Sequence, residues 1–212
     1  MVPIKQMLAH PENYGGVREM SNLWIPIHYT ANKNDTAENN GNYFAKNVVK
    51  ASAHFFVDDD SIVQSVPLDR IAYAVGGKKY ANCVNTGGGK YYGKCTNANS
   101  ISVELCGGKD NVYPSAKTIA NAVELVLYLM EATNTPQDRV IRHFDVTGKP
   151  CPAYWCGSAK RNEAWKTEFW SKCNLDRKLI QDKTGLADGT MDWLATYTYA
   201  SDLFRKLAAP MK

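Results

Sequence analysis

Short apolar segments that alternate with helical patterns constrain the fold of this chain more than any other feature of its sequence. Ser115 is followed by apolar residues at helical spacing from Ile119 to Met130, which predicts a long helix capped by that serine. Strands that alternate with helices predict an α/β domain, with a mixed central β-sheet flanked by helices. Pro26 lies inside one apolar segment and favours an edge strand there. The predicted strands are residues 23–29, 53–57, 62–66, 100–105 and 139–143.

Two of these strands are predicted to form a hairpin, and a second helix is predicted before them. Residues 53–57 and 62–66 are separated by a turn of consecutive aspartates at 58–60. Thr36 is a typical N-cap residue and is followed by an amphipathic pattern that reaches Val48. Residues 76–99 are rich in Gly, Asn, Lys and Tyr, and we interpret them as a long functional or mobile loop.

The sequence changes character after about residue 174. Apolar residues become sparser, and Gly185 and Gly189 are predicted to interrupt two or three short helices. We expect residues 1–174 to form the main domain. Residues 175–212 are either a small helical C-terminal module or a helical extension packed on that domain. The polar run 174–178 resembles a junction and favours the module.

Residues 143–152 carry the strongest chemical signal in the chain. They place the imidazole of His143 and the thiol of Cys151 eight residues apart, on either side of a Gly- and Pro-containing loop that can fold back. His28, at the end of a predicted strand, offers a third ligand. Two nitrogens and one thiolate form a known catalytic zinc set that leaves the fourth tetrahedral position open to water. These ligand types favour Zn²⁺ over Mg²⁺ or Ca²⁺.

Each of these residues alone has an ordinary structural explanation. His28 is then a hydrogen-bonded core histidine, and Cys151 is a buried apolar thiol. Their combination with Glu104 and Lys149 favours the chemical interpretation. Glu104 lies between two apolar neighbours in a predicted strand, so alternation turns its side chain to the face opposite theirs.

The order of these motifs resembles a known family. His28 lies in Ile-His-Tyr-Thr, a later strand is Ala-His-Phe-Phe-Val-Asp-Asp, and residues 100–105 are Ser-Ile-Ser-Val-Glu-Leu. Residues 143–152 contain His-x-Asp-Val-Thr-Gly-Lys-x-Cys-Pro. The sequence is similar to type 2 N-acetylmuramoyl-L-alanine amidases, particularly the catalytic domains of endolysins from phages of Gram-positive hosts. The resemblance covers about residues 5–173 and does not extend to the tail.

The resemblance implies both a fold and a reaction. It implies a mixed β-sheet flanked by helices, with one catalytic Zn²⁺ at the bottom of a surface groove. The implied reaction is hydrolysis of the amide between N-acetylmuramic acid and L-alanine in peptidoglycan. By motif, the ligands are His28, His143 and Cys151. Glu104 matches the catalytic acid/base, and Lys149 matches the basic residue beside the attacking water.

Tyr29, His54 and Tyr73 are the residues that we expect to contact the substrate. In the resemblance, His54 lies near the site but outside the ligand set. We therefore also interpret it as a supporting or core residue, with catalytic assistance as the lesser alternative. Ala74 departs from the family, because many relatives carry a histidine at this position, which tends to line the substrate groove. The departure affects fine substrate preference and leaves the metal site unaffected.

The long loop carries residues with two interpretations each. Cys83 and Cys95 bracket its glycine-rich part, and they either form a disulfide or remain thiols. The lack of a leader favours thiols. Tyr80, Tyr91 and Tyr92 either stack on sugar faces or cover the edge of the sheet.

The net charge and the hydropathy of the sequence indicate which kinds of partner to expect. The net charge is +4, but the basic residues are scattered, so we expect an ordinary surface and no nucleic-acid partner. No apolar run approaches a membrane span, and residues 1–10 lack the apolar core of a signal peptide. We therefore expect synthesis in the cytoplasm and no membrane insertion. Access to the cell wall would follow a holin-type membrane lesion made by another protein.

Two other functions are weighed on the same scaffold. A non-catalytic peptidoglycan recognition module would have lost zinc through replacement of the thiol ligand, and the presence of Cys151 argues against it. A regulatory protein that binds another macromolecule, such as a polymerase, rests on fold analogy alone. For residues 175–212, cell-wall binding or self-association is the expected role of a separate module.

Overall fold

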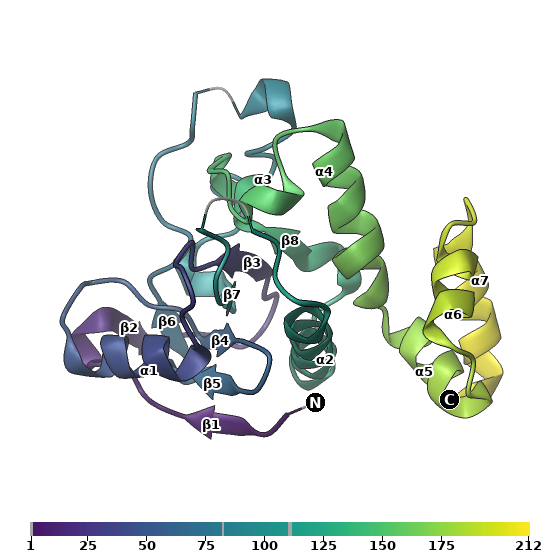
Figure 1. Ribbon diagram of the computed structural model, residues 1–212, viewed down its shortest axis with the longest axis horizontal. Helices are drawn as coiled ribbons and strands as arrows, with labels where there is room; N and C mark the ends of the chain where they lie inside the picture. Colours follow the sequence, from purple (N-terminus) through teal and green to yellow (C-terminus); the bar gives the residue numbers. More distant parts are fainter. Residues whose placement is uncertain (1, 82, 110–111) are drawn as a thin grey trace.

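The computed structural model describes residues 2–81, 83–109 and 112–212, and a mixed β-sheet lies at its centre (Figure 1). Only β4 and β5 pair antiparallel in this sheet, as the predicted hairpin requires, and its other pairs are parallel. The predicted α/β class with a mixed sheet flanked by helices is confirmed. In order across the sheet, the six strands are β1 (Ile4–Gln6), β5 (Ile62–Gln64), β4 (Phe55–Val57), β7 (Val103–Leu105), β3 (Ile25–Tyr29) and β8 (Val140–Arg142).

The two faces of the sheet carry different residues. Alternation along β3, β4 and β7 turns Ile27, Phe55 and Val103 to one face, where they join the main apolar core with helix α2 (Ala116–Thr133). The opposite face carries His28 and Glu104. Helix α1 (Ala37–Lys46) covers only the β4–β5 side of that face, so polar side chains can occupy the β7–β3 side.

Local hydrogen bonds explain where these helices begin and end. The side chain of Ser115 accepts a hydrogen bond from the backbone N–H of Thr118, and Thr36 does the same for Asn39, which confirms both predicted N-caps. The prediction that α1 reaches Val48 was wrong. Asn47 has an extended backbone conformation, and its backbone N–H donates the last hydrogen bond of the helix to the carbonyl oxygen of Tyr43.

Three strand predictions need correction. Pro26 does not mark an edge, because β3 lies between β7 and β8. Proline has no N–H to donate, and β7 pairs with β3 only from Ile27 onward, after an isolated bridge between Trp24 and Ser100. This interruption explains why β7 is shorter than the predicted strand 100–105. The last predicted strand ends at Arg142, one residue before His143.

A second small sheet and the long loop lie beside the central sheet. β2 (Tyr14–Val17) and β6 (Arg70–Ala72) pair antiparallel, and neither strand was predicted. The described residues of the predicted long loop, 76–81 and 83–99, contain two short 3₁₀ turns, Val84–Thr86 and Asn97–Asn99. Cys83 and Cys95 are buried and form no disulfide.

The C-terminal part is helical. The predicted helix 165–173 begins earlier, as α4 (Ala159–Ala164), and continues through a π-helical turn, Trp165–Phe169, and a 3₁₀ turn, Trp170–Lys172. Gly185 ends α5 in the left-handed conformation, as expected. Gly189 does not break a helix, because it lies in the first turn of the next one, where backbone N–H groups need no helical partner. The last helices are α5 (Leu175–Thr184), α6 (Asp188–Ala195) and α7 (Ala200–Ala208).

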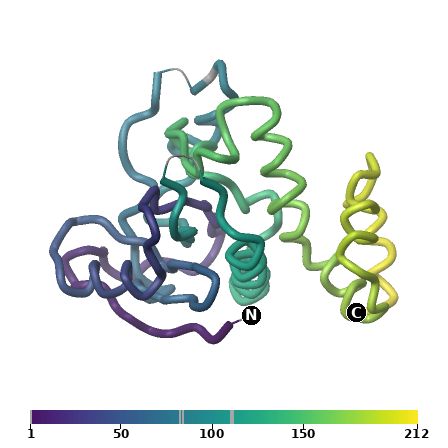
Figure 2. Tube along the Cα trace, viewed as in Figure 1, coloured from purple at the N-terminus to yellow at the C-terminus, as the bar shows by residue number. Residues whose placement is uncertain are grey.

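Helices α5–α7 lie together at one side of the molecule, beyond α4 (Figures 1 and 2). They enclose an apolar cluster of their own that includes Ile180, Met191 and Phe204. The division at residue 174 stays a prediction. Within the ranges that the structure describes, no helix is both long and apolar enough to span a bilayer.

His54 gives the fold a pH dependence. It is fully buried; its Nδ1 accepts a hydrogen bond from Ser102 N and its Nε2 donates one to Arg70 O, both at 3.1 Å. Burial lowers the pKa of His54 to about 3, so the folded state binds fewer protons than the unfolded state below the ordinary value of about 6.5. We expect the free energy of unfolding to fall as the pH drops from about 6.5 to 3, with His54 contributing up to about 1.4 kcal/mol per pH unit. Urea denaturation across this range should show a shallower slope in His54→Gln, and an unchanged slope would contradict the assignment.

Candidate active site

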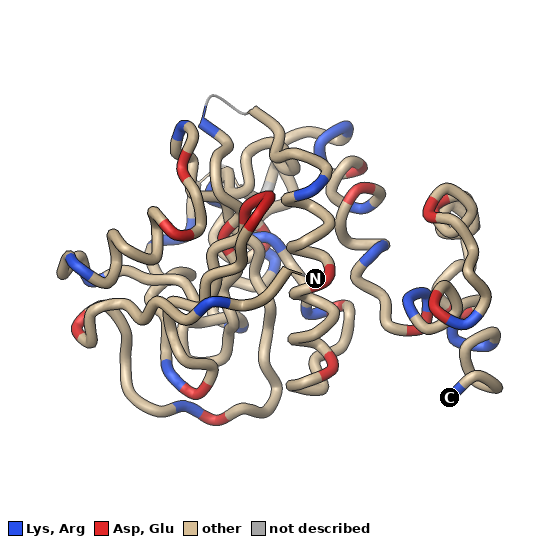
Figure 3. The backbone as a smooth tube through the Cα atoms, turned by 60° about the horizontal axis from the view of Figure 1, so that its bottom comes forward, with Lys and Arg blue, Asp and Glu red and all other residues tan. Residues whose placement is uncertain are grey.

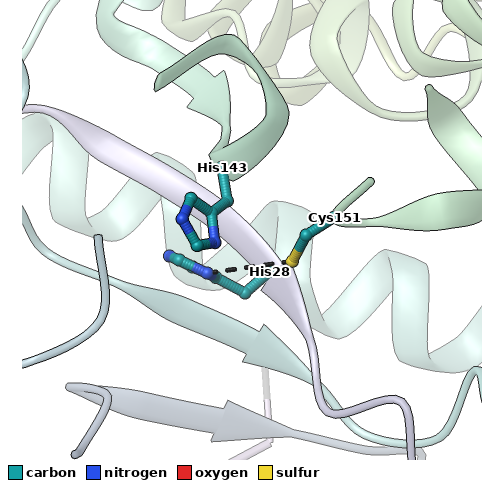
Figure 4. A group of neighbouring side chains, drawn as sticks. All are labelled: His28, His143 and Cys151. Carbon is teal, nitrogen blue, oxygen red and sulfur yellow. Dashed lines mark hydrogen bonds between the residues drawn. The ribbon is translucent and has the colours of Figure 1, made fainter. Parts of the chain in front are cut away.

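Three buried side chains meet on the β7–β3 side of the sheet. His28 comes from β3, His143 is the first residue of α3 (His143–Thr147), and Cys151 follows the loop after α3 (Figure 4). One ligand atom from each lies within 4.8 Å of the others. Cys151 Sγ is 3.9 Å from His28 Nδ1, and the two imidazole centroids are 4.6 Å apart. The structure thus brings together all three predicted ligands.

The arrangement of this triad fits a metal ion. Ligands of a tetrahedral Zn²⁺ at ordinary bond lengths are about 3.5 Å apart, close to the separation of Cys151 and His28. Among the described residues, His28 Nε2 and both nitrogens of His143 are buried and have no hydrogen-bond partner. Buried polar atoms without partners cost free energy, so a ligand that satisfies them would stabilise the site.

The protonation states of the triad suit the same interpretation. Burial lowers the pKa of His143 to about 4, and it also lowers the pKa of His28 well below its ordinary value. Both imidazoles are therefore neutral near pH 7, as metal ligands must be. Burial raises the pKa of Cys151, so its thiolate needs a nearby cation.

The turn that presents His143 and Cys151 is held from within. Arg142 forms two hydrogen bonds with the carboxylate of Asp145, of 2.7 and 3.0 Å, and a further one of 2.7 Å with Asn162. The backbone N–H of Phe144 donates to Cys151 O at 2.9 Å. Both side chains of the triad therefore depend on one compact segment.

Glu104 lies next to the triad because of strand register. Its partner in β3 is His28, and paired residues of neighbouring strands point to the same face. A carboxylate oxygen of Glu104 is 3.9 Å from His28 Nδ1. Burial raises the pKa of Glu104 to about 7, Lys149 opposes this rise, and Asp35 adds to it. A carboxyl group poised near neutrality can both accept and return a proton.

Surface hollows flank the triad on both sides. One hollow, of about 510 Å³, is lined by Glu104, Tyr29 and Tyr43, and the other, of about 490 Å³, by His143, Ala74 and Tyr80. Lys149 is exposed and lines both hollows, so it lies at their boundary, and we refer to the two hollows together as the groove.

Of the three residues predicted to contact the substrate, one lines this groove and two do not. Tyr29 lines it. Tyr73 does not, because its ring lies against Gly15 of β2, and its neighbour Ala74 faces the hollow instead. His54 is fully buried with both ring nitrogens bonded to backbone, so the structure does not bring it to the groove. The alternative interpretation of His54 as a core residue agrees with this position.

Sequence reasoning missed two residues near the site. Tyr154 is 1% exposed, and within the described part of the chain its hydroxyl has no hydrogen-bond partner. Its pKa is raised by burial and by the nearby Cys151 and Glu104. Its position shortly after the ligand motif was an available signal. Asp35 lines the groove and joins two loops, but nothing in the sequence around it indicated this role.

Together the fold and the site define a hydrolase domain in which a carboxylate lies beside a candidate metal-binding triad. Comparison with known proteins gives the family. Residues 20–154 match the family model described as N-acetylmuramoyl-L-alanine amidase, and the chain belongs to this family.

Similar proteins agree with this assignment. The chain is 34% identical over 149 residues to the N-acetylmuramoyl-L-alanine amidase BlyA of Bacillus subtilis, which covers 69% of this chain and 40% of BlyA. It is similar to the solved structure of PlyL, with a TM-score of 0.63, 28% identity and coverage of 81% and 97% of the two chains. A mutant endolysin from Bacillus subtilis gives a TM-score of 0.62 at 26% identity, over 82% of this chain and 100% of that one.

Gly148, in the turn between His143 and Cys151, allows a test of how this turn contributes to the free energy of unfolding. Gly148 has φ of 80°, and a Cβ there would lie 1.9 Å from the Cβ of Cys83. Gly148→Ala should lower the free energy of unfolding by about 3 kcal/mol, because a left-handed alanine and the steric overlap both destabilise the folded state. The matched control is Gly157→Ala, where φ is 87° but no atom lies within 4 Å, and where about 1 kcal/mol is expected. Equal losses in urea denaturation would contradict the close contact.

Proposed function

We propose that this protein is a zinc-dependent N-acetylmuramoyl-L-alanine amidase that cleaves the bond between N-acetylmuramic acid and L-alanine in peptidoglycan. The observation that carries the proposal is the meeting of His28, His143 and Cys151 beside Glu104 at the floor of a groove. Cys151 is retained, and a family member without catalysis would not need a third ligand.

His28, His143 and Cys151 would hold the ion. Bound there, Zn²⁺ supplies a Lewis acid that polarises the substrate carbonyl and acidifies water. Burial of the three side chains keeps competing water from their far sides and keeps both imidazoles neutral.

Glu104 would transfer the proton, and Lys149 would stabilise the negative charge that develops during the reaction. Glu104 takes a proton from the attacking water on its carboxylate and returns it to the departing alanine nitrogen, because a neutral amine is a far better leaving group than its anion. The ammonium of Lys149 lies between the two hollows and stabilises the negative charge that develops on the carbonyl oxygen. Tyr29 lines the groove beside these groups and would help position the sugar.

The biological setting is proposed from the same relatives. One similar structure is described as an endolysin, so a phage or prophage lysin that acts on the cell wall is the role that fits best. Such a protein would be made in the cytoplasm and would reach the wall through a holin-type lesion.

Zinc binding is the first test. We expect one Zn²⁺ per chain by calorimetry and a zinc-dependent rise in melting temperature, because the ion binds the folded state. Cys151→Ser should weaken binding by at least about a hundredfold, since even residues that only support metal ligands are worth tenfold or more. Cys173→Ser is the control, because Cys173 is an equally buried thiol in the core on the α2 side. Equal zinc affinity in both variants would refute the assigned ligand set.

The reaction is tested on purified peptidoglycan. We expect new free N-terminal alanine that disappears with chelator and returns with Zn²⁺. Glu104→Gln should lower kcat by about 10²–10⁴ while zinc stoichiometry is retained, because only proton transfer is lost. Glu131→Gln, an exposed change on α2, should behave as the unchanged protein. New reducing sugar ends would identify a glycosidase instead.

For residues 175–212 we propose a small helical module that binds the cell wall. Three aromatic side chains near the end of α6 and after it are largely exposed: Trp193 at 71%, Tyr197 at 56% and Tyr199 at 66%. Exposed aromatic faces can stack on sugars while their polar edges stay in water.

The module is tested by co-sedimentation with purified walls. Deletion of residues 175–212 should abolish most binding, and Trp193→Ala in the full chain should lower it about fivefold. Tyr128→Ala is the control, because it removes an aromatic side chain that is 46% exposed on the main domain. Unchanged lysis and binding after the deletion would refute the module.

A further inference from the structure

The two ends of the groove differ in charge. Lys78 and Lys79 line the hollow beside His143, together with Lys149. The sequence contains no Asp or Glu from residue 70 to residue 103, so no acid of the surrounding loop offsets these cations. Among the ion pairs of the described residues, none includes Lys78 or Lys79. Elsewhere, charges of both signs are interspersed along the chain (Figure 3).

The loop that carries these lysines is fixed against α3. The backbone N–H of Tyr80 donates to Thr147 O at 2.8 Å, and that of Gly89 donates to Phe144 O at 3.0 Å. The side chain of Lys79 packs across Gly89, where an added Cβ would lie 2.7 Å from its Cε. The positive charges are therefore held beside His143 by the same helix that presents this histidine.

The opposite end of the groove contains amides, tyrosines and an acid. Asn32, Asn39 and Tyr43 line it, with Asp35 among them. Asp35 accepts hydrogen bonds of 2.6 Å from Gly107 N and from the side chain of Asn40, which fix its carboxyl group at this end. Lys149 is the one lysine among the residues that line this hollow, so this end attracts anions less than the other end does, and its amides and tyrosines offer partners for hydroxyl and acetamido groups.

The substrate of the proposed reaction has a matching asymmetry. The glycan strand is uncharged beside the scissile bond, because the lactyl carboxyl of N-acetylmuramic acid is tied up in the amide. The stem peptide carries free carboxylates, beginning with the D-glutamate that follows L-alanine. Opposite charges favour one orientation of this substrate over the reverse.

We propose that Lys78 and Lys79 bind the free carboxylates of the stem peptide, and that the neutral glycan lies over the end lined by Asn32, Asn39 and Tyr43. The inference rests on the proposed amidase function. It makes the protein selective for stem peptides whose D-glutamate is a free acid over those in which it is amidated to D-isoglutamine.

The test measures binding separately from cleavage. Two GlcNAc–MurNAc muropeptides that differ only in D-glutamate or D-isoglutamine are titrated into ¹⁵N-labelled, zinc-loaded protein carrying Glu104→Gln, which slows turnover. We expect the acid to bind about fivefold tighter than the amide, since each exposed charge pair contributes modestly. Lys78→Gln with Lys79→Gln should remove this preference. Lys90→Gln with Lys94→Gln is the charge-matched control, because both residues are exposed on the same loop but line neither hollow.

Each result of this titration either supports the proposal or overturns it. A preference that is lost with Lys78 and Lys79 and kept in the control supports the proposal. No preference in the parent, or equal loss in both double variants, overturns it. Shifts at Lys78 and Lys79 with a ribitol phosphate polymer but not with the muropeptides would also overturn it. Failure of the protein with native Glu104 to cleave either muropeptide would count against the amidase function and leave the binding result readable.

Discussion

The register between β3 and β7 is the constraint on which the rest of the site depends. It sets His28 directly beside Glu104, and both side chains leave the sheet on the face that α1 only partly covers. If either strand slipped by one residue, its own polar group would turn toward the apolar core under α2, and Ile27 of β3 or Val103 of β7 would turn to the opposite face. The packing of that core therefore also fixes the relative positions of His28 and Glu104.

The second half of the site is built differently, from one tight segment rather than from paired strands. His143 and Cys151 are presented by α3 and the loop after it, which the Arg142–Asp145 pair and Gly148 hold in shape. The long loop 76–99 then packs on α3, so it lines the groove without being part of the sheet. The strands position His28 and Glu104, and the braced turn positions His143 and Cys151.

Much of this was predictable where the deciding interactions are local. The caps at Thr36 and Ser115 and the hairpin follow from neighbouring residues, and the motif at 143–152 pointed to two donors of the triad. The misses came from contacts between distant segments. His54 accepts a hydrogen bond from the backbone N–H of Ser102, 48 positions away in the sequence. Whether Tyr73 or Ala74 lines the groove depends on where the preceding strand β6 lies. The effect of Pro26 on β7 required knowledge of the strand order.

The donors that meet in the triad are far apart in the chain, since His28 and Cys151 are separated by 123 positions. No nascent polypeptide that stops short of Cys151 contains all three, and the parallel strands between them must close before the donors meet. A metal ion therefore cannot nucleate folding from the N-terminal end. Translation products that end before Cys151 lack the complete triad, so the three donors come together only after the whole domain has been synthesised.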